Sequence, residues 1–298
     1  MKVFRKKFTH SPYNIQMSLT RQSPKAKQFN QEGYYVEPSL FREEECDHLI
    51  EHYMSLRVGP LPGDCEGFDA TSTDPLKRYP RMVHMHRWDD ISLQWGIDQR
   101  IHEVLIELLE EEPYLVQTMM YFKPAGGRGQ ALHQDNTYLR AEPGTCVAAW
   151  LALDDCDEEN GCLQIVPHTQ QLPVMCTIEA DTTKSFTGDT TPLPEGLQPQ
   201  PIIMNRGDCL FFNGSVIHGS FPNTSTNRFR RSLIGHYITG NCKKVAQFYH
   251  PVLRMDGSNI EFEQSEIGSE CGVWIEDQSE PKVKMIASAS HDRVAKHE

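Results

Sequence analysis

Short apolar segments rich in β-branched and aromatic residues, beginning at Val116, constrain the fold of this chain most strongly. Six of them follow one another: VQTMMYF, CVAAWLAL, CLQIV, QPIIM, CLFFNG and SLIGHYI. Turn-rich stretches such as KPAGGRG, DEENG and NRGD lie between them. Short strands separated by regular turn signals are typical of an antiparallel sandwich or barrel. We therefore predict a mainly β core.

The residues before this core have helical patterns. Ser23-Pro24 predicts a helix start and Gly33 its end, and residues 34–36 then predict a short strand. Residues 43–56 place apolar side chains at i, i+3, i+4 and i+7, which predicts an amphipathic helix. Another helix is predicted over residues 97–109, with Pro113 closing it. We expect one domain over residues 1–298, with a helical layer over about 1–112, a β core over about 113–240 and a C-terminal extension over 241–298.

Charge and cysteine usage narrow the class of protein. A formal net charge of −12 argues against nucleic acid as a partner, since phosphate binding requires clustered Lys and Arg. No apolar run is long enough to cross a membrane, and no apolar region follows the basic N-terminus as in a secretory signal. The nine cysteines have scattered spacings, which favours a reduced, cytoplasmic protein with buried thiols over a disulfide framework.

The segment ALHQDNTY places His133 two residues before Asp135. In an extended strand the two side chains point to the same face, close enough to hold one cation. Taken alone, the pair is more typical of a solvated surface strand. The segment GDCLFFNGSVIHGS supplies a third candidate ligand, His218, at the end of a predicted strand. Two histidines and one carboxylate form the facial triad of non-heme Fe(II) sites, which leaves coordination positions open.

Two adjacent arginines follow in the segment NRFRRSLIGHY. An Fe(II) site that uses 2-oxoglutarate needs a buried cation for the distal carboxylate, and arginine provides a bidentate fork. Strand alternation places Arg230 and Ser232 on one face and Arg231 on the other. By the same alternation His236 is predicted to be a hydrogen-bonded core histidine, while His84 and His86 are predicted to line a pocket or lie on the surface.

The segment from about Val116 to Tyr237 resembles the phytanoyl-CoA dioxygenase family of Fe(II)/2-oxoglutarate oxygenases. The likeness rests on LHQD, AAWLALDDCDEENGCLQIVP, GDCLFFNGSVIHGS and FRRSLIGHY, in this order. The N-terminal stretch FNQEGYYVEPSLFREEECDHL is similar to the opening helix and strand of that family. The resemblance implies a double-stranded β-helix, a cupin-like jelly-roll barrel flanked by helices.

The resemblance also implies roles for individual residues. His133, Asp135 and His218 would bind Fe(II), and Arg230 would hold 2-oxoglutarate with Ser232 beside it. Trp150 and Arg81 match residues that contact the cosubstrate in relatives. Met119 matches a strand position that lines the same pocket, and Gln117 shares its face. The chain departs from many members after IVP, where it has His168-Thr169-Gln170 in a turn that borders the barrel mouth. It keeps Asp135, whereas halogenating relatives carry a small residue there, so an oxidation such as hydroxylation is favoured.

The leading hypothesis is a dioxygenase that uses Fe(II), 2-oxoglutarate and O2 to oxidise a small-molecule substrate. Two alternatives stay open. A non-catalytic cupin-like protein could bind a small molecule in the same barrel, and a zinc enzyme could use the same three ligands. The intact triad together with Arg230 argues against a simple binding module. Neither the substrate nor the oligomeric state follows from the sequence.

Overall fold

The computed structural model describes residues 22–62, 65, 68–266, 268, 270–275 and 281–287. Its helices are α1 (Pro24–Glu32), α2 (Glu43–Leu56), α3 (Pro75–Arg78), α4 (Asp90–Gly96), α5 (Gln99–Leu109) and α6 (Asn136–Leu139), with the short 3-10 turns η1 (Met85–Arg87) and η2 (Gln247–Tyr249). The basic stretch at the N-terminus lies outside the described residues. No helix in the described part of the chain is long and apolar enough to cross a membrane.

The predicted helical patterns are confirmed over α1 and α2. Ser23 Oγ accepts a hydrogen bond from Ala26 N at the start of α1, and Gly33 ends that helix with a left-handed φ of 88°. The helix predicted over residues 97–109 begins later than expected. Ile97 ends α4 instead, and the Asp98 carboxylate caps the start of α5. The helix closes at Glu110, so Pro113 opens the next strand rather than ending the helix.

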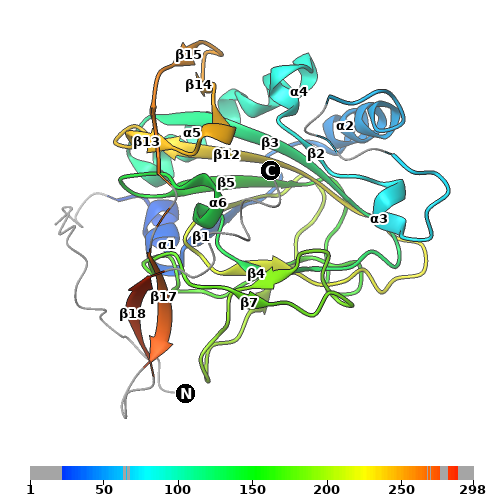
Figure 1. Cartoon of the computed structure of the whole chain (residues 1–298). Coiled ribbons are helices and arrows are strands. Elements are labelled where there is room, and N and C mark those ends of the chain that lie inside the picture. The colour runs from blue at the N-terminus through cyan, green and yellow to red at the C-terminus, as the bar shows by residue number, and fades with distance from the viewer. Residues whose placement is uncertain are drawn as a thin grey trace.

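The larger sheet carries most of the fold. Its strand order is β1 (Tyr34–Glu37), β10 (Cys209–Asn213), β5 (Cys146–Ala152), β12 (Arg230–Thr239), β3 (Pro113–Lys123), β14 (Val252–Arg254) and β15 (Asn259–Ile260), and β2 (Met82–Val83) also pairs with β3. The pairings in this sheet are antiparallel. Figure 1 shows α2 and α4 on one side of this sheet and β4 (Gln130–His133) on the other.

A smaller antiparallel sheet faces the larger one. Its order is β4, β11 (His218–Ser220), β6 (Leu163–Ile165) and β9 (Gln200–Pro201). These two sheets, with the helices outside, confirm a mainly β jelly-roll architecture, and all six predicted strands are present. Among the described residues, the strand pairing does not join the two sheets into one closed barrel.

The two faces of β5 separate two hydrophobic cores. Val147, Ala149 and Leu151 belong to the core formed with α2 and α5, which contribute Tyr53 and Leu105. The alternate residues belong to the core between the sheets: Ala148, Trp150 and Ala152. Because neighbouring strand residues point to opposite faces, one apolar strand serves both cores. The inner core is the space into which the candidate site residues project.

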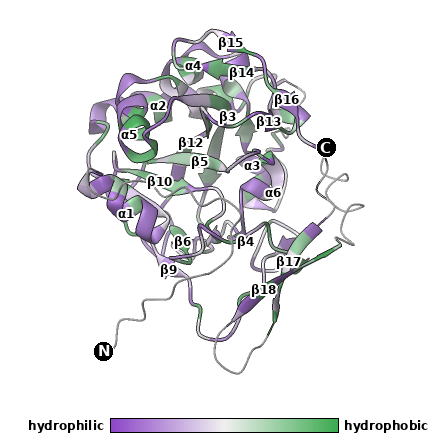
Figure 2. Cartoon of the chain, turned by 90° about the vertical axis from the view of Figure 1, so that its left-hand side faces the viewer, coloured by the Kyte–Doolittle hydropathy of each residue, from purple (hydrophilic) through white to green (hydrophobic). Residues whose placement is uncertain are grey.

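The remaining short strands lie outside the two main sheets. They pair as β13 (Lys244–Val245) with β16 (Glu263–Gln264), β7 (Ile178–Glu179) with β8 (Asp189–Thr190), and β17 (Glu270–Ile275) with β18 (Lys282–Ala287). The β17–β18 hairpin lies at the end of the molecule away from α2 and α4 (Figure 2). A disulfide joins its Cys271 to Cys176, contrary to the expectation of free thiols throughout, while the other seven cysteines are free.

Candidate metal centre

Three buried side chains meet between the two sheets. His133 is the last residue of β4, and His218, the first residue of β11, pairs with it in register. The Asp135 Oδ1 atom lies 3.6 Å from the Nε2 atom of each histidine. One ligand atom from each residue lies within 4.8 Å of the others, and this is the only such group found among the described residues. Two imidazoles and one carboxylate at this spacing fit a divalent first-row metal ion with open positions.

The local backbone differs from the prediction although the side chains converge. Asp135 has helical dihedrals, φ −62° and ψ −35°, and opens α6 instead of continuing the strand. His133 and Asp135 therefore meet because a strand end passes into a helical turn, not because of strand alternation. His218 begins β11 and does not end the preceding strand, which stops at Asn213.

Hydrogen bonds orient both imidazoles toward the carboxylate. His133 Nδ1 lies 2.9 Å from Ala131 O, and His218 Nδ1 lies 3.0 Å from Val216 O. A carbonyl oxygen only accepts, so each Nδ1 carries the proton and donates it. Each Nε2 then has a lone pair facing the centre, which is the tautomer that a metal ion requires.

The charges at the centre also suit a metal ion. Burial, followed by the neighbouring His133, lowers the pKa of His218 to about 4, so its imidazole is neutral and can coordinate. Burial alone would raise the pKa of Asp135. The adjacent His218 and His236 outweigh that effect and hold the pKa of this carboxyl well below its usual range. A neutral imidazole at His218 beside an ionised Asp135 suits metal binding, because a metal ion requires its ligands in these protonation states.

His236 is a fourth residue at the centre that sequence reasoning did not assign to it. Its Nε2 atom lies 3.1 Å from Asp135 Oδ2, whereas the 3.6 Å contacts with His133 and His218 involve Oδ1. The prediction of a hydrogen-bonded core histidine is confirmed, and the partner is Asp135. Alternation along β12 from Arg230 was the available signal, but the sequence does not show which residue His236 would meet.

The two arginines have the orientations that alternation predicted. Arg230 is buried, its Nη1 donates to Ser232 Oγ over 2.8 Å, and its Nε donates to Gly161 O over 3.1 Å. Its guanidinium carbon lies 5.4 Å from the ring centroid of Trp150. Arg231 instead points to the other face and forms a bidentate ion pair with Asp154, with contacts of 2.9 and 2.6 Å.

Lys123 is a buried cation that the sequence reading missed. It is the partner of Arg230 across the β3–β12 ladder, and its Nζ lies within hydrogen-bond distance of Gly161 O, Ser220 Oγ and Phe221 O. Burial, followed by the charge of Arg230, holds the pKa of this amine well below its usual range. The signal was present in β3, because Gln117, Met119 and Lys123 share one face of the strand.

The other predicted residues are distributed along the same interior. Trp150 and Met119 are cross-strand neighbours of Ile234 and pack in the inner core. Gln117 is opposite His236, at the level of Asp135. Arg81 lies just before β2, and its charge acts on Tyr138 of α6. His168 is exposed, and its ring is hydrogen-bonded to Gln31 O of α1.

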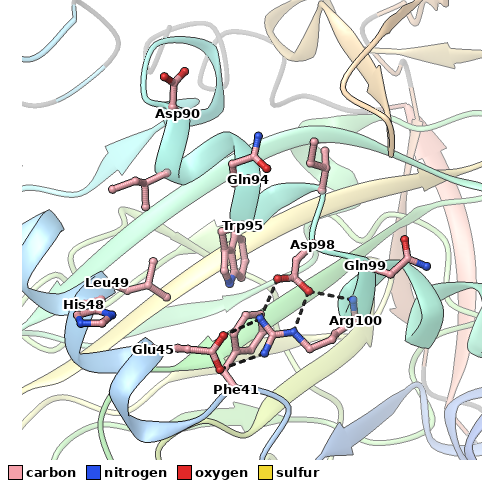
Figure 3. Close-up of a pocket in the computed structure, with 12 residues that line it drawn as sticks. Phe41, Glu45, His48, Leu49, Asp90, Gln94, Trp95, Asp98, Gln99 and Arg100 are labelled. Carbon is pink, nitrogen blue, oxygen red and sulfur yellow. Dashed lines mark hydrogen bonds and ion pairs between the residues drawn. The ribbon is translucent and has the colours of Figure 1, made fainter.

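A hollow of about 530 Å³ on the helical layer is separate from the triad (Figure 3). Residues of α2, α4 and the start of α5 line it, and none of the triad residues does. Arg100 occupies its floor, where it bonds Glu45 and Asp98 and stacks 4.0 Å from the ring of Phe41. These charged groups satisfy one another, so the hollow presents no unpaired charge from this network to a ligand.

Two facing antiparallel sheets enclose a centre of two histidines and one carboxylate. This arrangement defines a jelly-roll protein with a candidate metal site. The chain belongs to the phytanoyl-CoA dioxygenase (PhyH) family, whose model matches residues 29–232.

Similar proteins agree with this assignment. Phytanoyl-CoA dioxygenase 1 of Oryza sativa subsp. japonica is 31% identical over 145 residues, covering 47% of this chain and 50% of that protein. A phytanoyl-CoA dioxygenase domain-containing protein 1 homolog of Dictyostelium discoideum is 30% identical over 154 residues, covering 50% of this chain and 54% of that protein. The chain thus spans about half the length of the curated relatives that it matches.

Two solved structures share the fold at low sequence identity. The non-heme alpha ketoglutarate dependent epimerase SnoN from nogalamycin biosynthesis has a TM-score of 0.58 at 19% identity, over 73% of this chain and 83% of that one. EctD from S. alaskensis with bound Fe has a TM-score of 0.58 at 20% identity, over 73% and 76% of the two chains. At this identity the likeness establishes the fold.

Proposed function

We propose that this protein is an Fe(II)- and 2-oxoglutarate-dependent dioxygenase that hydroxylates a small molecule. One observation carries the proposal: a buried triad of metal-ligand type shares an interior with two buried cations that have no carboxylate partner in the described part of the chain. Burying an uncompensated cation is costly, so the arrangement calls for an anionic ligand. A dicarboxylate that chelates a metal ion at one end meets both requirements.

The proposed metal ligands are His133, Asp135 and His218. Iron in the Fe(II) state fits this set because two imidazoles and one carboxylate leave positions open for a chelating acid and for O2. A structural zinc site would be closed by a fourth ligand. No fourth His, Cys, Asp or Glu joins the group among the described residues. His236 would keep the Asp135 carboxylate oriented.

The proposed cosubstrate site extends from the triad along β12 and β3 to Arg230. Arg230 and Ser232 would bind the distal carboxylate directly, and Lys123 would add positive charge behind them. Trp150 and Met119 would form the walls of this channel. Gln117 and Arg81 would contact the cosubstrate or substrate nearer to its mouth. Being packed in the inner core, these walls exclude water from the site.

Iron bound together with 2-oxoglutarate and O2 would supply the oxidation of a substrate C–H bond, with release of succinate and CO2. The residues of the chain hold the ligands, neutralise the distal carboxylate and orient the substrate. Hydroxylation is the proposed outcome because the chain keeps Asp135 as a proposed metal ligand. The neighbours of the same fold include proteins described as an epimerase and a carbocyclase, so product analysis is part of the test.

The test combines a binding and a turnover measurement. Anaerobic addition of Fe(II) and 2-oxoglutarate should produce the weak visible charge-transfer band of the chelate, and admission of O2 should release succinate. The matched variants are Arg230→Ala, which should lose the band at moderate 2-oxoglutarate concentration, and Arg231→Ala, which should keep it. A protein that binds zinc but shows neither the band nor succinate release would disprove the proposal and favour a different metalloenzyme or a binding protein.

A further inference from the structure

Several imidazole nitrogens near the proposed metal centre have no hydrogen-bond partner in the described part of the chain. They are both ring nitrogens of His84, Nε2 of His86 and Nδ1 of His236. The side chain of His84 is 1% exposed and that of His86 is 4% exposed, so bulk water does not satisfy their ring nitrogens. Because buried polar groups in proteins are nearly always hydrogen-bonded, a group of this kind requires an explanation.

The imidazole of His84 lies at the end of the interior that also contains the triad. Its backbone N donates to Thr118 O over 2.7 Å, which joins it to β3 beside Gln117. The ring centroid of His84 lies 4.6 Å from that of Phe248 and 5.8 Å from that of Tyr249, both on η2. The C-terminal segment thus closes over His84.

His84 is also close enough to His236 for their charges to interact, and His236 touches Asp135. The side-chain amide of Gln117, directly across the ladder from His236, makes no hydrogen bond to another described residue. The imidazole of His84 and the side-chain amide of Gln117, neither of which is hydrogen-bonded to a described residue, therefore lie on the side of the interior that contains His236 and Asp135.

The backbone of His84 is held in an unusual conformation. Its φ of 53° lies in the left-handed region, which side chains other than glycine and asparagine rarely adopt. Such conformations persist only where surrounding contacts impose them, and they concentrate at functional sites. The ring itself is held by its contacts with Phe248 and Tyr249.

The protonation state of the cluster selects the kind of ligand. Burial, followed by the charge of Arg87, lowers the pKa of His84 to about 2, and burial lowers that of His86 to about 3. A neutral imidazole offers one donor and one acceptor and no charge to attract an anion. These rings also form no metal site with a third ligand among the described residues.

We propose that His84 and Gln117 recognise an uncharged hydrogen-bonding group of the substrate, such as a hydroxyl, carbonyl or amide, with Phe248 and Tyr249 against its apolar part. This inference rests on the proposed oxygenase function, because only that function makes the ligand at this site a substrate. The site therefore favours a compact substrate with a neutral polar group over a substrate that carries a carboxylate. The same recognition site offers nothing to the phosphates of a coenzyme A ester.

The experiment uses the full chain loaded with Zn(II) and 2-oxoglutarate, and records the histidine ring nitrogens by NMR with ¹⁵N-labelled histidine. The probes are cyclohexanecarboxamide and the matched anion cyclohexanecarboxylate. The carboxamide should shift the His84 signals saturably, and the carboxylate should bind roughly tenfold more weakly or not at all. Failure of the carboxamide to shift His84, or equal binding of the carboxylate, overturns the proposal.

The test variant is His84→Gly, because glycine adopts the positive φ without strain and removes the ring. Carboxamide affinity should fall roughly 3- to 10-fold, as expected for one lost hydrogen bond between uncharged groups. The matched control is His168→Gly, since His168 also has a positive φ, 66°, but an exposed side chain. If the glycine variant folds poorly, carboxamide affinity is measured in His84→Asn instead. Asparagine tolerates this φ and keeps a donor and an acceptor.

The two proposals fail separately. Retention of the iron–2-oxoglutarate band and of substrate-free succinate release in His84→Gly is expected, because His84 does not touch the triad or Arg230. Loss of probe binding with an intact band supports the recognition role. Unchanged probe affinity in His84→Gly overturns that role while leaving the proposed oxygenase untouched, and absence of the band in the wild type refutes the oxygenase alone.

Discussion

Lys123 and Arg230 are direct partners across the β3–β12 ladder, and both side chains donate to the same carbonyl oxygen, that of Gly161. Neither has a carboxylate partner among the residues that the structure describes. Burial, followed by repulsion from the adjacent Arg230, holds the pKa of the Lys123 amine well below its usual range. The arrangement becomes favourable when a dianion lies beside both.

The first prediction follows from this pair. In the ligand-free protein the Lys123 amine donates to Gly161 O, Ser220 Oγ and Phe221 O, and no carboxylate among the described residues stabilises its charge. A bound dicarboxylate raises the pKa of the amine, so 2-oxoglutarate binding should take up a proton at pH values between the free and bound pKa. Calorimetry in buffers of different ionisation enthalpy measures this uptake.

The matched variant for this prediction is Lys123→Met, which keeps an unbranched side chain and removes the charge. It should bind 2-oxoglutarate roughly tenfold more weakly and lose the proton uptake. Lys244→Met serves as the control, because Lys244 is on the short strand β13, outside the interior. Identical buffer dependence in wild type and Lys123→Met would show that the proton goes elsewhere.

The second prediction separates the two adjacent arginines. Truncating one member of a buried charge pair costs roughly 2–5 kcal/mol, so Arg230→Ala should weaken 2-oxoglutarate binding by about 30- to 3,000-fold. Arg231→Ala should change it little, because Arg231 pairs with Asp154 on the opposite face. Arg230→Lys should recover part of the loss, since an ammonium cannot form the planar fork. A 2-oxoglutarate titration that follows the iron chelate band measures the affinity of each variant. A greater loss of affinity in Arg231→Ala than in Arg230→Ala would contradict the role assigned to Arg230.

The third prediction concerns the metal ligands and the residue behind them. Asp135→Ala should abolish turnover and most metal affinity, as should His133→Ala and His218→Ala. His236→Phe should weaken metal binding by roughly 10- to 100-fold, because partners that orient a ligand typically contribute that much. A Co(II) titration against a chelating dye measures both effects.

A second histidine–aspartate pair provides the control for His236. His52 Nε2 lies 3.0 Å from Asp89 Oδ1 in the helical layer, away from the triad. His52→Phe therefore removes a similar contact without touching the proposed centre, and its metal affinity should equal that of the wild type. Equal affinity in His236→Phe would mean that Asp135 needs no second support.

The sequence predicts local structure where periodicity is long and uninterrupted. The helix over 43–56 and the four longest strands of the large sheet, β3, β5, β10 and β12, follow directly from spacing, because burial on one face or on two faces selects the residues. The break between α4 and α5 was missed, since the Asp98 cap falls inside a continuous apolar pattern. A cap is a single side-chain hydrogen bond and leaves no periodic trace.

The site was predictable as a set of residues but not as a geometry. Strand alternation predicts that His133 and Asp135 share a face, whereas the strand ends at His133 and Asp135 opens a helical turn. Lys123 was missed because a lysine in a strand is ordinarily at the surface, and only the pairing with Arg230 reveals its burial. The contact between His236 and Asp135 joins positions 101 residues apart, which no local pattern encodes.

The fourth prediction tests the disulfide. Under denaturing, non-reducing conditions, thiol titration should find seven free cysteines of the nine in the chain, and nine after reduction. The bond closes a loop with a sequence separation of 95, so Cys271→Ser should lower the free energy of unfolding by roughly 2–4 kcal/mol under oxidising conditions. Cys242→Ser, at a free cysteine, is the comparison. Nine free thiols without reductant would exclude the pairing.

The last prediction is that acid destabilises the fold partly through His84. Burial lowers the pKa of this imidazole to about 2 in the folded protein, whereas in the unfolded chain it is near 6.5. Below about pH 6.5 the unfolded state therefore binds a proton that the folded state does not, and stability falls as the pH falls. The slope approaches about 1.4 kcal/mol per pH unit for each such group.

His86, with a pKa of about 3, adds a second contribution of the same sign, so the difference between variants is the decisive quantity. His84→Asn removes one titrating group and retains a residue that tolerates the positive φ. Urea unfolding from pH 7.5 to pH 5 in the metal-free protein should give a shallower pH slope for His84→Asn, by nearly one proton at the acidic end. His48→Asn, the same substitution at an exposed position of α2, is the matched control variant. Parallel curves for wild type and His84→Asn would mean that the ring is not enclosed, and the recognition role argued for His84 would lose its basis as well.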